Sequence, residues 1–138
     1  MDHRAAIADL VYTYALNIRS GNGAACVELF TADALYEMFV TDPADLSRRL
    51  RNRLEGRDAI IAYITGASTP AVRVIPMIHN LIISIDGNEA ISTCAMSAVT
   101  VPTGDDLVGE YRDTFGFDGK WRFTSRAHTI LLHRKTRL

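Results

Sequence analysis

The sequence has few of the features that mark metal, disulfide or membrane proteins. Its 138 residues include only two cysteines, Cys26 and Cys94, with no CxxC pair and no Cys/His cluster at zinc spacing. Such cysteines are typical of buried free thiols in a reducing compartment. No apolar run approaches the roughly 20 residues that a membrane helix needs, and the first residues (MDHRAAIADL) do not resemble a signal peptide. We therefore expect a cytoplasmic protein with no metal site and no membrane partner.

Motifs of cofactor-dependent and hydrolytic enzymes are also missing. The sequence has no Walker motif, no GxGxxG after a strand, no GxSxG and no HExxH. This disfavours phosphate-driven, nicotinamide, serine-hydrolase and zinc chemistry, and we expect no cofactor. The formal net charge is -1, so the composition gives no reason to expect nucleic acid as a partner.

What the chain does have is an ordinary globular composition, with 48% hydrophobic and 22% charged residues over the length of a single domain, 1–138. Apolar spacing predicts a first helix from His3 to about Ile18 with Asp2 as its N-cap. Further helices are predicted over 24–30 and 57–65, with a strand over 34–40. The polar segment 41–55, which holds four arginines that could bind an anion, is predicted to be a solvated loop or a short helix.

The second half of the chain is predicted to be a β-meander. Segments rich in Val, Ile and aromatic residues are separated by turn signals such as DG and PTG, and they cover 72–86, 89–101, 107–117 and 121–133. Helices followed by a meander are typical of an α+β fold. We expect N-terminal helices packed on a curved antiparallel sheet, which together form a cone with one internal pocket.

Five segments in order resemble the SnoaL-like branch of the nuclear transport factor 2-like superfamily: IADLVYTYAL, ELFTADALYE, EGRDAII, HNLIISIDGNEA and GEYRDTFGFDGKWRFTSR. The resemblance implies a cone-shaped domain. It is shared by dehydratases, dehydrohalogenases, ketosteroid isomerases, polyketide cyclases, epoxide hydrolases and non-catalytic binding proteins, so the fold does not select a reaction. It also implies a homodimer or higher homo-oligomer that assembles through the outer sheet face.

The resemblance further implies a catalytic dyad, which this sequence lacks. In dehydratase and dehydrochlorinase members, a His accepts the proton and an Asp at the end of the first helix orients that His. Gapless matching puts Arg19 at the Asp position and Pro76 at the His position. Two hypotheses follow. One is a cofactor-independent lyase or isomerase acting on a small apolar molecule, including aromatic or polycyclic ones. The other is a non-catalytic small-molecule-binding or interaction module.

Four residues are the candidates for catalysis. Arg126 matches an Arg that stabilises negative charge in the similar enzymes, or else it forms a salt bridge with Asp113 or Glu110. Asp113 would order the network. Tyr14 lies on the inward stripe of the first helix, where it could donate to an oxyanion or simply be a core aromatic. His79 could be the base if a strand bulge carries it into the cone, although a lone His is more often structural.

Eight further residues are predicted to contact the ligand. Arg19 could bind a carboxylate or phenolate, or it could point to solvent at the helix end. Strand alternation places His128 on the face of Arg126, and Tyr111 on the face of Asp113. Methionines and aromatics adapt to flat apolar ligands, but they are equally typical of a core. The predicted set is Asn17, Arg19, Tyr36, Met38, Asn80, Met96, Tyr111 and His128.

Overall fold

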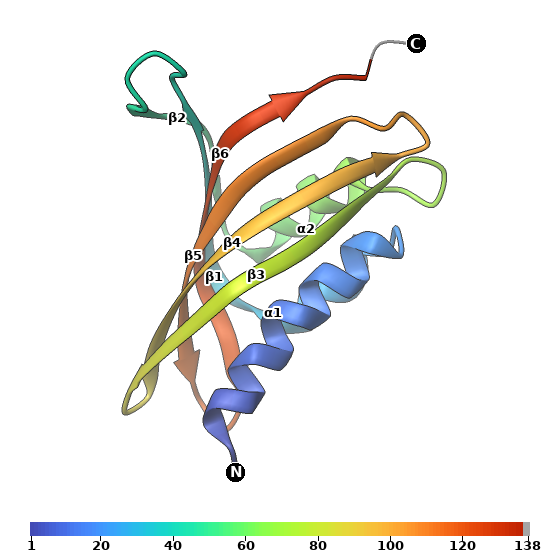
Figure 1. Ribbon diagram of the computed structural model, residues 1–138. Coiled ribbons are helices and arrows are strands. Elements are labelled where there is room, and N and C mark those ends of the chain that lie inside the picture. The colour runs from blue at the N-terminus through green and yellow to red at the C-terminus, as the bar shows by residue number, and fades with distance from the viewer. Residues whose placement is uncertain (137–138) are drawn as a thin grey trace.

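A curved six-stranded sheet with helices over its concave face makes up the computed structural model, which describes residues 1–136 (Figure 1). The strand order is β2-β1-β6-β5-β4-β3. Neighbouring strands are antiparallel except β1 and β6, which are parallel. The strands are β1 (Phe30–Thr41), β2 (Arg48–Glu55), β3 (Arg73–Asp86), β4 (Glu89–Val101), β5 (Asp106–Phe117) and β6 (Trp121–Arg134). The α+β fold predicted from the sequence is confirmed.

Two α-helices and one 3₁₀ helix cover the sheet: α1 (His3–Arg19), η1 (Gly23–Leu29) and α2 (Arg57–Ala67). Asp2 is the N-cap of α1, as predicted, and its Oδ1 accepts a hydrogen bond of 3.0 Å from the backbone N–H of Ala5. The predicted helix over 24–30 is instead the tighter η1. This helix packs closely against α2: a Cβ added to Gly23 would come within 3.0 Å of the Ile64 backbone.

The arginine-rich segment forms a strand over 48–55, and the prediction of a loop or short helix there was wrong. The strand β2 (RRLRNRLE) pairs antiparallel with β1 at the edge of the sheet. Asn52 and Leu54 are half-buried while Arg53 and Glu55 are exposed, which is the period of two that a strand requires. The arginines obscured this pattern, although charged side chains are common on edge strands because they discourage pairing with other chains.

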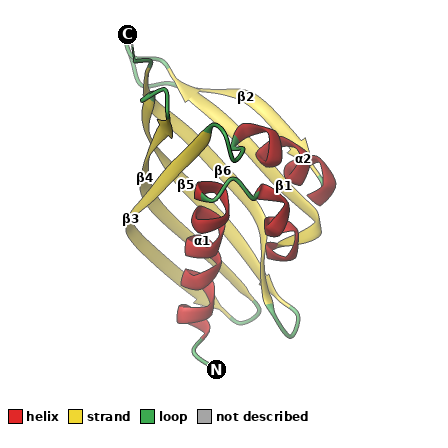
Figure 2. Cartoon of the chain, turned by 90° about the vertical axis from the view of Figure 1, so that its right-hand side faces the viewer, coloured by secondary structure: helices red, strands yellow, loops and turns green. Residues whose placement is uncertain are grey.

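The core lies between the helices and the concave face of the sheet. Figure 2 shows α1 and α2 lying across that face. Along β4 and β5, buried and exposed positions alternate, so one face of each strand packs inward. Ile7 and Val11 of α1 and the stacked rings of Phe30 and Phe123 are fully buried. None of the helices within residues 1–136 is long and apolar enough to cross a membrane.

Candidate functional site

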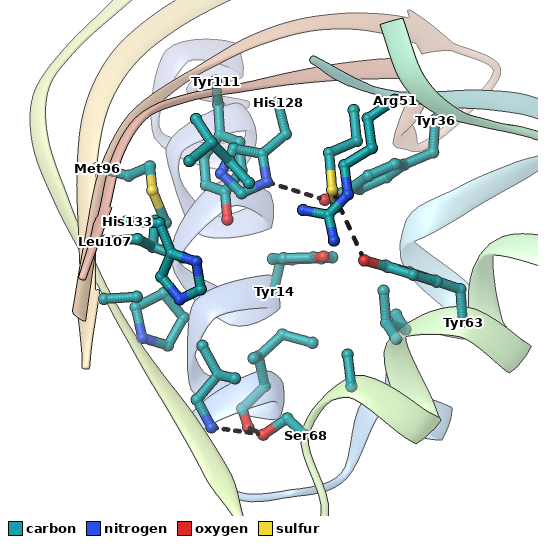
Figure 3. A pocket seen from close by; sticks show the side chains of 18 residues that line it. Tyr14, Tyr36, Arg51, Tyr63, Ser68, Met96, Leu107, Tyr111, His128 and His133 are labelled. Atoms are coloured by element: carbon teal, nitrogen blue, oxygen red, sulfur yellow. Dashed lines mark hydrogen bonds between the residues drawn. The ribbon is translucent and has the colours of Figure 1, made fainter. Parts of the chain in front are cut away.

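A cavity of about 210 Å³ lies between the helices and the concave face (Figure 3). Its walls are mostly apolar, with Met38, Met96, Pro76, Val74 and Leu107 among them. Within residues 1–136, no group of three or more His, Cys, Asp or Glu side chains could hold a metal ion. The polar side chains on the cavity wall are Tyr14, Tyr36, Arg51, Tyr63, Ser68, Tyr111, His128 and His133.

Four tyrosines, from α1, β1, α2 and β5, give the cavity its polar character. Burial raises the pKa of Tyr14 to about 12 and raises the pKa values of Tyr36 and Tyr111 well above the ordinary range. Burial raises the pKa of Tyr63 as well, and its hydroxyl lies 3.7 Å from the sulfur of Met38. All four hydroxyls are therefore protonated at neutral pH and can donate hydrogen bonds to a ligand.

His128 is a neutral imidazole in the cavity wall. Its Nδ1 lies 3.4 Å from the hydroxyl of Tyr36, and its ring is 4.7 Å from that of Tyr111. Burial, together with the positive charge of Arg126, lowers the pKa of His128 to about 3. The Nε2 atom is buried with no hydrogen-bond partner in the described part of the chain. A buried polar atom without a partner is costly, so the wall at this point is less stable than a fully hydrogen-bonded one would be.

Arg126 and Asp113 form a buried ion pair behind the cavity wall, in which Nη1 of Arg126 has no hydrogen-bond partner among the described residues. The Arg126 Nε and Nη2 atoms donate to the two carboxylate oxygens of Asp113 at 2.7 and 2.9 Å, and both side chains are fully buried. Burial alone would lower the pKa of Arg126, but the Asp113 charge and hydrogen bonds raise it well above its usual value. The guanidinium also stacks on Tyr111 and Tyr14, at 3.7 and 4.3 Å from their ring centres.

This geometry corresponds to the structural alternative from the sequence, the salt bridge between Arg126 and Asp113. Neither residue is among those that line the cavity. Their opposite charges compensate each other, and the rings of Tyr14 and Tyr111 pack against the guanidinium of Arg126. The pair therefore fixes the position of two cavity tyrosines, and both carboxylate oxygens of Asp113 are occupied by Arg126.

His79 and Asn80 lie away from the cavity. His79 is exposed on the convex face, with its Nε2 atom 2.9 Å from the hydroxyl of Ser97 on β4. The register of β3 does shift, but only after His79, where Asn80 adopts a φ of 55°. His79 therefore keeps the outward orientation of its strand position, whereas its neighbour Ile78 faces inward opposite Met96.

Asn17 and Arg19 at the end of α1 also lie outside the cavity, although Ile18 between them lines it. Arg19 is exposed and lines a shallow surface depression with Tyr12 and Leu16. Asn17 donates to the sulfur of Cys26 at 3.7 Å. Of the residues predicted from the sequence, those that the structure brings together on the cavity wall are Tyr14, Tyr36, Met38, Met96, Tyr111 and His128.

Four polar residues of the cavity were missed from the sequence, namely Arg51, Tyr63, Ser68 and His133. Arg51 belonged to the segment predicted as a loop, although its capacity to bind an anion was recognised. Tyr63 follows Ile60 on α2 by three positions, a spacing that places both on one helix face. The register between β5 and β6 shifts at Leu131, and this places His133 on the same side of β6 as His128 and Ile130. The sequence does not reveal this shift.

The sequence from 1 to 127 matches the SnoaL-like domain. The chain belongs to this family. No curated protein sequence matches the chain. Among solved structures, the fold is similar to a proposed scytalone dehydratase from Novosphingobium aromaticivorans (TM-score 0.74, 19% identity, 98% of this chain and 88% of that one). It is also similar to a type 2 hexachlorocyclohexane dehydrochlorinase (TM-score 0.76, 13% identity, 97% and 88%).

A third similar structure is the beta subunit of a proposed aromatic-ring-hydroxylating dioxygenase, also from Novosphingobium aromaticivorans (TM-score 0.77, 18% identity, 97% of this chain and 92% of that one). At these identities the likeness shows the shared NTF2-like cone fold, which is found in dehydratases and dehydrochlorinases, and it does not show a shared reaction. Of the two residues that gapless matching predicts at the family dyad positions, Pro76 lines the cavity and Arg19 does not.

Proposed function

We propose that the protein binds a small, mostly apolar molecule that carries at least one oxygen atom. The observation that carries this proposal is the apolar cavity with four protonated tyrosines on its wall. Inside the mouth, which holds Arg51, the wall supplies neutral hydrogen-bond donors and no free carboxylate among the residues described. Such a wall favours a carbonyl, hydroxyl or ether oxygen over a cationic group.

The size of the cavity limits the ligand. An apolar protein cavity of about 150 Å³ holds a benzene molecule. The cavity here, at about 210 Å³, has room for one substituted ring or a compact pair of fused rings. A larger polycyclic molecule would have to extend through the mouth, where Arg51 and His133 are exposed.

A matched pair of ligands tests whether the tyrosines recognise oxygen. We expect 2-naphthol to raise the melting temperature of the wild-type protein by several degrees, because a ligand that prefers the native state stabilises it. Naphthalene, which has the same ring shape, should raise it less. The Tyr36→Phe variant should lose the difference between the two. If neither compound shifts the melting temperature of the wild type at the highest concentration that dissolves, the binding proposal is contradicted.

Proton transfer without a cofactor is the second candidate function, as in a dehydratase, cyclase or isomerase. It is favoured by the contact between His128 and Tyr36 beside two further tyrosine donors. In this scheme His128 accepts a proton from a carbon next to a carbonyl, and a tyrosine hydroxyl donates a hydrogen bond to the enolate oxygen. A pKa of about 3 makes His128 a weak base, which is why binding is placed first.

Hydrogen–deuterium exchange separates the two candidates. If the protein catalyses proton transfer, the wild type should accelerate exchange of the α-hydrogens of 2-tetralone in D₂O. NMR measures the rate of this exchange. The His128→Gln variant should lose the acceleration, while His79→Gln, which alters a histidine on the convex face, should retain it. Binding of 2-tetralone with no acceleration would reject proton transfer and leave the binding proposal standing.

A further inference from the structure

Arg51 brings a positive charge to the mouth of the cavity. Its side chain lines the cavity, and in Figure 3 its guanidinium points inward toward Tyr14 and Tyr63. The ion pairs of the described residues involve Arg53, Arg126 and Arg134, and none involves Arg51. The cavity therefore has an arginine whose charge the surrounding protein leaves unpaired.

A strand irregularity places Arg51 there. Asn52 of β2 is opposite Met38 of β1, but the next pair along joins Leu50 to Phe39, so Arg51 is the extra residue of a β-bulge. A bulge turns a side chain away from strict alternation, and bulges are common beside functional sites. The neighbouring Arg53 instead forms ion pairs on the surface with Glu37 and Glu55, each at 2.9 Å.

The rest of the site makes the charge of Arg51 stand out. The inner charge, on Arg126, is compensated by Asp113 at 2.7 Å. The cavity wall between that pair and the mouth is apolar or neutral, because its tyrosines are protonated and His128 is uncharged. The positive charge of Arg51 is sensed inside the site, since it lowers the pKa of Tyr63 against the larger raising effect of burial.

We propose that the ligand is a small organic acid whose apolar ring system fills the cavity and whose carboxylate meets Arg51 at the mouth. This inference rests on the proposed binding function and adds the chemical class of the ligand. An arginine fork matches a carboxylate through two parallel hydrogen bonds. The anion-binding role that the sequence offered for Arg19 thus falls to a residue on another element.

An acid and its uncharged isostere test the inference. By isothermal titration calorimetry at pH 7, we expect 2-naphthoate to bind the wild-type protein about 10- to 100-fold more tightly than 2-naphthamide, the range for a hydrogen bond to a charged group. Arg51→Gln should remove this preference. Arg49→Gln, an exposed arginine on the same strand that does not line the cavity, should keep it.

The outcomes separate this inference from the function on which it rests. If the wild-type protein binds acid and amide equally, the carboxylate inference is overturned and the cavity remains a site for neutral ligands. If Arg51→Gln, shown by circular dichroism to be folded, keeps the preference, then another cation selects the acid and the assignment to Arg51 is wrong. If neither compound binds the wild type, the binding function itself is contradicted.

Discussion

At the residue scale, His128 links the chemistry of the cavity to the stability of the fold. Its pKa is lowered from 6.5 to about 3 by burial and by Arg126, so between these values the unfolded chain binds a proton that the folded chain does not. The contribution of His128 to the free energy of unfolding is therefore fully present above pH 6.5, and it is lost as the pH is lowered toward 3.

A comparison of the wild type with His128→Gln isolates this contribution. Between pH 8 and pH 5 we expect the wild type to lose about 2 kcal/mol more free energy of unfolding than the variant. Urea denaturation at several pH values measures the difference, and the carboxylates common to both proteins cancel. Parallel pH profiles for the two proteins would mean that His128 is not held neutral by burial.

The Arg126–Asp113 pair gives a second residue-scale prediction. Asp113→Asn leaves the buried guanidinium without its counter-charge, so we expect a loss of about 3–5 kcal/mol in the free energy of unfolding. The double variant Arg126→Met/Asp113→Leu removes both charges, and it should be clearly more stable than the single variant. Chemical denaturation decides, and a single variant as stable as the wild type would contradict the structural role of the pair.

The residues of the site were predictable where a regular pattern decides orientation. Tyr14 falls on the inward stripe of an amphipathic helix, and Tyr111 and His128 follow strict alternation on central strands. His79 was not predictable in this way, because β3 carries apolar residues on both faces and alternation alone does not say which face is inside. Arg51 owes its position to a bulge, and the sequence gives no clear signal of an extra residue in a strand.

At the element scale, the meander was predictable and the sheet edge was not. The β4 strand begins and ends where the sequence predicts, because a tight DGN turn precedes it and PTG follows. The edge strand β2 has only half of its alternation filled by apolar residues, and its arginines made it resemble a loop. Its partner β1 also pairs in parallel with β6, a long-range contact that local periodicity does not contain.

Gly109 tests how closely β5 and β6 are packed. A Cβ at this position would meet the backbone carbonyl oxygen of Thr129, which cannot move without disturbing β6. We expect Gly109→Ala to lower the free energy of unfolding by about 1–3 kcal/mol. Gly66→Ala in α2 is the matched control, because a Cβ there meets no atom within 4 Å and alanine favours a helix. Equal effects in urea denaturation would contradict this packing.

At the scale of the whole molecule, the convex face of the sheet is the surface we expect to mediate self-association. Met77, Ile82, Ile91 and Val108 are large apolar side chains exposed on β3, β4 and β5. The family resemblance predicts a homodimer or higher oligomer through this face. Sedimentation velocity at micromolar concentration should show an assembly, and Ile82→Asp should weaken it. A monomeric wild type would contradict the prediction.

The cone as a whole followed from the order of elements and from the family resemblance, but its chemistry did not. The resemblance locates a dyad at two positions, which here hold Arg19 and Pro76, and it gives no indication of what replaces the dyad. The tyrosines and the neutral His128 of the cavity wall meet only when five elements are brought together in space.

The most direct test of the central claim is calorimetric titration of 2-naphthol into the wild-type protein and into Ala98→Phe. Ala98 is buried in the cavity wall on β4, so a phenyl group at this position fills the space that we assign to the ligand. The account predicts saturable one-to-one binding to the wild type and none to the variant, whose fold is checked by circular dichroism. Equal binding by both proteins, or no binding by the wild type, would contradict the claim that this cavity is the ligand site.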